Sequence, residues 1–241
     1  MQQRKKAFLA ALVLFLALLT GGAQAVEKGY TVFYGDREKN MIALTVDDCY
    51  DSERVAEVLD LCEKYDIPVT FFVIGSALQD ADAALWARAL ELGCEIGNHT
   101  WSHPKLPDLD ARRIYEQLTR TQTRLDEVLG FHYPMQVMRP PYGSLARDAH
   151  HMSDGWVVNA IAEAGYLHAV RWDVSQTDPE KAAKDVQNGS ILLYHANTKD
   201  VRCLEKLIPA LLTDYTCVTV SELLDLTPPA YGEHSATGEI E

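Results

Sequence analysis

The chain has 241 residues, of which 47% are hydrophobic, and its formal net charge is −13 at pH 7. This length and apolar content suit one α/β domain of barrel size or two small domains. Such an acidic chain is a poor candidate for binding nucleic acid or an anionic membrane, whereas a neutral or cationic substrate can approach it more easily.

The first 25 residues have the three parts of a secretory signal peptide. Arg4, Lys5 and Lys6 make a basic start, residues 7–19 are an unbroken apolar run, and a small-x-small cleavage site ends at Ala25. The run is short for a membrane span, and an uncleaved anchor is the alternative. We predict cleavage after Ala25 and a mature protein that is secreted or associated with the cell envelope, without a stable membrane anchor.

Strand-like and helix-like segments alternate along the rest of the chain. The predicted strands cover residues 41–46, 68–74, 94–97, 135–138, 166–172, 191–194 and 216–220. The predicted helices cover residues 52–65, 82–92, 110–129, 157–164, 179–186 and 201–212. This alternation is typical of βα units around a parallel sheet, and about seven strands in this length predict a closed or nearly closed barrel.

Ionisable residues gather at the C-terminal ends of the predicted strands. Asp47-Asp48, His99, Arg139, the segment 173–178 and His195 each lie at or just past such an end. In a βα barrel these ends share one face, which is where functional sites are built. Because five separate segments contribute to this face, the sequence predicts a functional site there.

His99 and His103 are four residues apart in the sequence His-Thr-Trp-Ser-His-Pro. Two histidines and one carboxylate make a three-ligand set for a catalytic zinc-like ion that keeps one position open for water. This spacing alone also arises by chance among eight histidines, so the prediction depends on the Asp47-Asp48 pair at the same face. A dication bound to one of these two carboxylates would leave the other as a general base; the alternative is a solvated turn or helix cap.

Two more segments supply candidates for the chemistry. Arg139-Pro-Pro-Tyr-Gly143 is a rigid loop in which Arg139 could hold a carboxylate and the Tyr142 N–H could point at a developing oxyanion. Alone, such a loop is more often an ordinary turn. His195 follows an apolar strand and could donate a proton, although a lone histidine is more often only hydrogen-bonded.

Together these segments resemble the five ordered motifs of the polysaccharide deacetylases, also called the NodB-homology domain or carbohydrate esterase family 4. The matching segments are Thr45-Val-Asp-Asp-Cys49, His99-Thr-Trp-Ser-His103-Pro104, Arg139-Pro-Pro-Tyr-Gly143, Trp172-Asp-Val-Ser-Gln-Thr-Asp178 and Ile191-Leu-Leu-Tyr-His195. The resemblance covers about residues 40–225, and the second and third motifs match closely.

The resemblance implies a single-domain, deformed (β/α) barrel of about seven parallel strands that removes acetyl groups from N-acetylated sugars. Asp48, His99 and His103 would bind one divalent metal ion, zinc first and cobalt or nickel next. Asp47 would be the general base and Arg139 would orient it. His195 would protonate the departing amine, and the Tyr142 N–H would stabilise the oxyanion. The substrate would be contacted by Pro141, Tyr142, Trp101 and Leu193. Leu193 would line an acetyl pocket, and Trp101, between the two histidines, could stack on a sugar face.

The chain departs from the family pattern in its first, fourth and fifth motifs. Cys49 stands where glycine is usual, which is tolerable if the backbone there needs no positive φ, and its thiol is a weak candidate ligand. In the fourth motif Ser175 replaces the aspartate that normally supports the acid histidine, and Asp173, on the same side of a strand, or Asp178 could replace it. The aspartate that often follows the last histidine is Ala196 here.

We predict a signal peptide over residues 1–25, an N-terminal extension over 26–39, a deacetylase domain over 40–226 and a flexible tail over 227–241. The predicted function is N-deacetylation of amino-sugar polymers, peptidoglycan first and chitin-like oligomers second, with no nucleic-acid partner. The alternatives are an O-acetyl esterase acting on xylan or other glycans, and a catalytically impaired glycan-binding protein. The pairing of the five cysteines and the oligomeric state stay open.

Overall fold

The structure is a computed structural model, and it describes residues 29–148 and 153–227. The predicted signal peptide and all of the predicted tail but its first residue lie outside the described residues. Within the described part of the chain, no helix combines the length and the apolar character that crossing a membrane requires.

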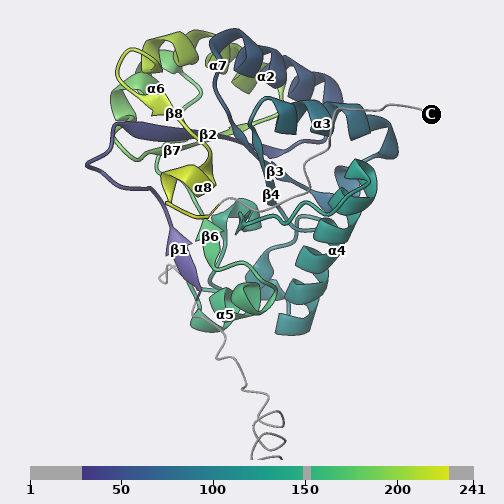
Figure 1. The fold of residues 1–241 in the computed structure, drawn as a ribbon. Coiled ribbons are helices and arrows are strands. Elements are labelled where there is room, and N and C mark those ends of the chain that lie inside the picture. Colours follow the sequence, from purple (N-terminus) through teal and green to yellow (C-terminus); the bar gives the residue numbers. More distant parts are fainter. Residues whose placement is uncertain (1–28, 149–152, 228–241) are drawn as a thin grey trace, which may run out of the picture.

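Seven parallel strands form one sheet that curls into a half-barrel (Figure 1). Their order from edge to edge is β1-β6-β5-β4-β3-β2-β7, and a further strand, β8, pairs with β2 off this path. The bounds are β1 Tyr30–Val32, β2 Met41–Asp48, β3 Thr70–Val73, β4 Glu95–Asn98, β5 Val137–Met138, β6 His168–Val170, β7 Ile191–His195 and β8 Thr216–Cys217. This curled parallel sheet confirms the predicted deformed barrel and the α/β fold class.

The sheet extends beyond the predicted strands at both of its borders. β1 lies within residues 26–39, which the sequence predicted as an extension, and it pairs with β6. At the other border, a bridge between Val174 and Leu192 joins the chain after β6 to β7. The fold therefore begins upstream of residue 40, and the segment that follows β6 helps to close the curl.

Alternate residues of β2 pack into two different hydrophobic clusters, as the two-residue period of a strand requires. One set contributes to the large cluster beneath the helices: Ile42, Leu44 and Val46. Ala43 belongs to a smaller cluster with residues of β3, β5, β6 and β7, on the concave side of the sheet. By the same alternation Thr45 and Asp47 continue this concave side toward the end of the strand, where the predicted site lies.

Helices cover the outer side of the sheet (Figure 1). Their bounds are α2 Ser52–Tyr65, α3 Ala83–Glu91, α4 Ala111–Leu129, α5 Gly155–Glu163, α6 Pro179–Asp185 and α7 Thr198–Leu211. Neighbouring helices pack in the order α6-α7-α2-α3-α4-α5. α4 shows why these segments are helical: the Asp110 carboxylate caps its first turn, Gly130 ends it with φ 76, and its buried positions recur every three or four residues.

β8 and a short helix, α8 (Val220–Leu223), cover the end of the sheet where the strands begin. Glu95, buried at the start of β4, accepts hydrogen bonds from Thr70 Oγ1 at 2.9 Å and from the Ser221 N–H at 3.1 Å. Burial raises the pKa of Glu95 above its usual value. The N–H of Val220 donates to Thr70 Oγ1 at 2.9 Å, so this polar cluster attaches α8 to the sheet. The predicted site lies at the opposite end of the barrel, where the strands end.

The five cysteines are all buried free thiols. The sulfur atoms of Cys62 and Cys94 lie 3.9 Å apart in a thiol–thiol hydrogen bond between α2 and the start of β4. These are contacts of the core beneath the helices, to which both residues belong.

Candidate active site

β2 ends in two aspartates that have different partners. Asp47 is 3% exposed, and its Oδ1 accepts a hydrogen bond from Arg139 Nη1 at 2.6 Å. Its other oxygen, Oδ2, lies 3.7 Å from His99 Nε2. Asp48 has φ 71, a left-handed conformation that turns the chain out of the strand. The pair therefore offers one carboxylate to the buried arginine and one to the histidines.

Asp48, His99 and His103 form a cluster whose ligand atoms lie within 4.8 Å of one another. Asp48 Oδ1 is 3.4 Å from His99 Nε2 and 3.5 Å from His103 Nε2. Burial acts to raise the pKa of Asp48, but the hydrogen bond and charge of His99 and the charge of His103 outweigh it and lower that pKa. Burial and the neighbouring His99 lower the pKa of His103. An ionised carboxylate and a neutral imidazole are the forms that bind metal.

His99 is fixed in the tautomer that a metal ligand needs. It follows β4 directly, is 2% exposed, and its Nδ1 lies 2.8 Å from the carbonyl oxygen of Arg139. A carbonyl oxygen only accepts, so Nδ1 carries a proton and Nε2 is the ring nitrogen that faces Asp48. One carboxylate and two imidazoles suit a borderline divalent ion such as zinc. The donor set of this cluster therefore fits the predicted metal.

Arg139, which follows β5, is wholly buried and joins three elements. Its Nη1 donates to Asp47 Oδ1 and to Thr45 Oγ1, both at 2.6 Å. Its Nη2 donates to the carbonyl oxygen of Arg171 at 3.1 Å, and its Nε donates to that of Val170 at 3.3 Å. Burial lowers the pKa of Arg139, while the charge of Asp47 opposes that shift. Arg139 thus holds the carboxylate of Asp47 in a single orientation.

We expect Arg139→Met to lower the free energy of unfolding by about 3–5 kcal/mol, because the buried Asp47 would lose its cation. Urea unfolding at pH 7 measures the change. The control is the double variant Arg139→Met with Asp47→Asn, which should recover part of the loss because the remaining buried group is neutral. A single-variant loss below about 1 kcal/mol, as for an exposed ion pair, would contradict this role.

His195 ends β7 beside Asp47, its register partner in β2. Its N–H donates to Asp200 Oδ2 at 2.8 Å, and its Nδ1 lies 3.3 Å from the same oxygen. The hydrogen bond that the His195 ring donates to Asp200 raises the pKa of His195. Because Nδ1 donates its hydrogen bond to the Asp200 carboxylate, Nε2 is free to contact other partners. Asp200 lies in the first turn of α7, which begins after the cap residue Asn197.

A family model described as "Polysaccharide deacetylase" matches residues 34–166, more than half of the chain. The chain belongs to the polysaccharide deacetylase family. The match covers the first three sequence motifs, from the aspartate pair of β2 to the loop that follows Arg139.

Known proteins similar to this chain include peptidoglycan and xylan enzymes. A peptidoglycan-N-acetylglucosamine deacetylase of Listeria monocytogenes is 30% identical over 209 residues, which are 82% of this chain and 40% of that protein. A family 4 carbohydrate esterase from Bacillus anthracis has 28% identity and a TM-score of 0.67, with 82% and 88% of the two chains covered. An acetyl xylan esterase from Clostridium thermocellum, solved with cobalt, has 27% identity and a TM-score of 0.62, with 76% and 89% covered. The chain spans less than two thirds of several curated relatives.

In this chain the fourth-motif aspartates have partners other than His195. The donors to Asp173 are Arg37 Nη2 at 2.7 Å, Ser190 Oγ at 2.9 Å and the Ile191 N–H at 2.8 Å. Asp178 caps α6 through the N–H groups of that helix. The carboxylate that contacts His195 is that of Asp200, which we had not identified from the sequence. The signal available was Asn197-Thr-Lys-Asp, a helix cap followed by an acid in the first turn.

Three predicted substrate-binding residues lie beside the Asp48, His99 and His103 cluster or beside His195: Tyr142, Pro141 and Leu193. Tyr142 is 62% exposed with φ 60, and its ring packs edge-on against the ring of His103 with centroids 4.5 Å apart. Pro141 is buried in the same turn. Leu193 is 8% exposed and lies two residues before His195, on the same side of β7. These positions suit contact with a substrate held at the cluster.

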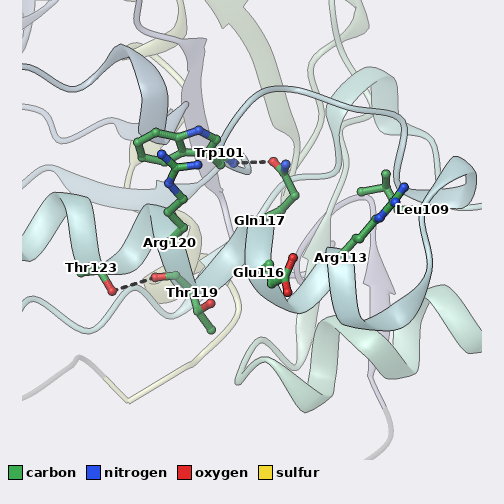
Figure 2. Close-up of a pocket in the computed structure, with 8 residues that line it drawn as sticks. All are labelled: Trp101, Leu109, Arg113, Glu116, Gln117, Thr119, Arg120 and Thr123. Carbon is green, nitrogen blue, oxygen red and sulfur yellow. Dashed lines mark hydrogen bonds between the residues drawn. The ribbon is translucent and has the colours of Figure 1, made fainter.

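One face of the Trp101 ring is covered by a side chain of α4. The guanidinium carbon of Arg120 lies 3.6 Å from the centroid of the indole ring (Figure 2). A cation therefore already covers one face of the ring that the sequence proposed as a sugar platform. Leu109 and six residues of α4 line a pocket beside Trp101: Arg113, Glu116, Gln117, Thr119, Arg120 and Thr123.

Cys49 adopts the left-handed backbone conformation that favours glycine. Its φ is 57, so the backbone there does need a positive φ, contrary to the condition we set from the sequence. The side chain is 6% exposed and its Sγ contacts the carbonyl oxygen of Val46 at 3.7 Å. Burial raises the pKa of this thiol well above its usual value. The cluster of possible metal ligands consists of Asp48, His99 and His103 and does not include Cys49.

Proposed function

We propose that the protein removes N-acetyl groups from amino-sugar polymers outside the cytoplasm, with peptidoglycan as the first substrate and chitin-like oligomers as the second. The observation that carries the proposal is the cluster of Asp48, His99 and His103 beside the buried Asp47 carboxylate. The similarity to a peptidoglycan-N-acetylglucosamine deacetylase supports the choice of substrate. The sequence of the first 25 residues supports export.

Asp48, His99 and His103 would hold one divalent ion, zinc first and cobalt or nickel next. When bound, such an ion supplies Lewis-acid chemistry: it polarises the acetyl carbonyl and lowers the pKa of a water molecule. The cobalt ion in the related acetyl xylan esterase supports a divalent cation in this family.

Asp47 is the general base in the proposed reaction. Arg139 occupies its Oδ1, so Oδ2, which faces His99, is the atom left to take a proton from the attacking water. Arg139 acts as a positioning residue because its own contacts fix the carboxylate. The hydroxyl oxygen adds to the acetyl carbon, and the Tyr142 N–H stabilises the oxyanion that forms.

His195 is the general acid for the second half of the reaction. The carbon–nitrogen bond breaks readily only if the nitrogen leaves as a neutral amine, so a proton must reach it as the bond breaks. The Nε2 of protonated His195 carries that proton, because Nδ1 is bound to Asp200. The products are acetate and a free amino sugar. The Asp200 carboxylate beside His195 counts against a catalytically impaired binding protein.

We expect Asp200→Asn to move the alkaline limb of the kcat/KM profile to lower pH. Asp200 stabilises the protonated form of His195 and raises its pKa, so neutralising it lowers that pKa. The acid then loses its proton at a lower pH, and activity falls earlier as the pH rises. Acetate release from a chitooligosaccharide across a pH series measures the limb. Asp178→Asn, at the cap of α6, is the control that should leave it in place; an unmoved or alkaline-shifted limb for Asp200→Asn would contradict the role.

The proposed function is tested by acetate release from purified peptidoglycan and from chitooligosaccharides with added Zn²⁺ or Co²⁺. Release from either supports it, and no release from both by protein that carries its metal overturns it. O-acetyl esterase activity is the second candidate, favoured by the similarity to an acetyl xylan esterase. An ester leaving group needs less help from an acid, so an esterase would prefer O-acetyl xylan and tolerate loss of His195.

A further inference from the structure

We infer that Gln117 of α4 is a positioning residue for the metal-binding loop, residues 99–103, which we call the ligand loop. Gln117 Oε1 accepts hydrogen bonds from the N–H groups of Trp101 and Ser102, both at 2.9 Å, and Figure 2 shows the first. Its Nε2 donates to Ser102 Oγ at 3.1 Å. Gln117 thus binds the middle of the loop whose two ends are His99 and His103. The inference rests on the proposed metal site.

The ligand loop needs an anchor because its backbone is strained. Thr100 has φ 69 and His103 has φ 59, both in the left-handed region. A β-branched residue such as Thr100 rarely adopts this conformation, and it persists only where the surroundings enforce it. A relaxed loop would move the His103 ring relative to His99, so their Nε2 atoms would no longer converge on Asp48.

Gln117 completes the hydrogen bonding of the ligand-loop backbone. The loop's own segment supplies two acceptors and the 75–76 turn supplies two donors. These bonds are Thr100 N–H to Asn98 Oδ1 at 2.9 Å, His103 N–H to Thr100 Oγ1 at 3.1 Å, Gly75 N–H to the Thr100 carbonyl at 3.0 Å and Ser76 N–H to the Trp101 carbonyl at 2.9 Å. The His99 N–H donates to the Val73 carbonyl at 2.9 Å. The remaining two N–H groups, of Trp101 and Ser102, are the ones that Gln117 binds.

α4, which carries Gln117, packs closely against the ligand loop and the 75–76 turn. One turn further along the helix, Arg120 packs on the Trp101 ring (Figure 2). A Cβ at Gly75 would lie 2.7 Å from both Thr121 Oγ1 and Trp101 Cε3, so the turn, the ring and the helix are in close contact. A shorter or apolar side chain at position 117 would leave two N–H groups beside the ligands without their acceptor.

The test compares zinc affinity, measured by chelator competition without substrate, in four variants. Gln117→Leu should weaken zinc binding about 10-fold to 100-fold, the usual effect of losing an outer-shell partner. Gln117→Asn, whose amide is one methylene too short, should also weaken it and serves if Gln117→Leu does not fold. Gln117→Glu keeps an oxygen that accepts both N–H groups and should bind zinc nearly as the wild type does.

Gln122→Leu is the matched control on the same helix. Gln122 binds the Tyr133 carbonyl at 2.7 Å and the Met135 N–H at 3.0 Å, away from the ligand loop. We expect this variant to lower the melting temperature in EDTA with unchanged zinc affinity. Equal zinc affinity for wild type, Gln117→Leu and Gln117→Asn overturns the inference, as does an equal loss in Gln122→Leu. Wild-type protein that binds zinc but releases no acetate contradicts the proposed function and leaves this comparison intact.

Discussion

Asp47→Asn is expected to lower acetate release by about 10²-fold to 10⁴-fold, the contribution of a positioned general base. The asparagine amide has the shape of the carboxylate, and its oxygen can still accept from Arg139, but it cannot take a proton from water. Because Asp47 lies outside the cluster of Asp48, His99 and His103, zinc binding should remain close to that of the wild type.

The measurement pairs turnover of a chitooligosaccharide with zinc content of the same preparation. Asp51→Asn is the control, since Asp51 caps α2, with a long 3.9 Å contact to Arg54, and asparagine caps a helix equally well. A zinc-loaded Asp47→Asn variant that keeps more than about a tenth of the wild-type rate would contradict the assignment of the base.

His103→Asn is expected to abolish tight zinc binding and to lower turnover by about 10³-fold or more. A Lewis acid contributes several kcal/mol to such a reaction, and each ~1.4 kcal/mol is a factor of ten. We choose asparagine because it tolerates the positive φ of position 103, so the loss reports on the ligand and not on the backbone.

Zinc affinity by chelator competition and acetate release under excess zinc are both measured. His132→Asn is the control. The His132 side chain lies in the loop after α4, is 68% exposed and pairs with Asp126 of α4 at 2.6 Å. Retention of wild-type zinc affinity by His103→Asn would remove His103 from the ligand set. Together, Asp47→Asn and His103→Asn distinguish the effect of losing the general base from the effect of losing the metal.

The barrel could be predicted because its strands are apolar runs between amphipathic helices, and this pattern is local in the sequence. The gathering of Asp48, His99 and His103 at one face follows from the same topology, since Asp48 ends β2 and residues 99–103 form the loop that follows β4. β1 could not be predicted in this way: Tyr30–Val32 is a three-residue strand whose pairing with β6 depends on the finished sheet.

The partners of the site residues were harder to predict than the residues themselves. Asp200 contacts His195 only because α7 begins at Thr198, three residues before the predicted start, which puts Asp200 in its first turn. Gln117 reads in the sequence as one more polar position of an amphipathic helix. Its contact with Trp101 depends on how α4 packs, which is long-range information.

Residues with a left-handed backbone conformation are concentrated in the loops of the candidate active site. Of seven non-glycine residues with positive φ in the described chain, five lie in the three loops of the site: Asp48, Cys49, Thr100, His103 and Tyr142. Each is disfavoured by about 1–2 kcal/mol relative to a right-handed conformation, so the site is the least relaxed part of the barrel. Selection for heat resistance alone would favour glycine at these positions, while selection for turnover would keep the side chains. The two goals conflict at these five positions, so an engineered, more heat-stable version should take its substitutions from elsewhere in the fold.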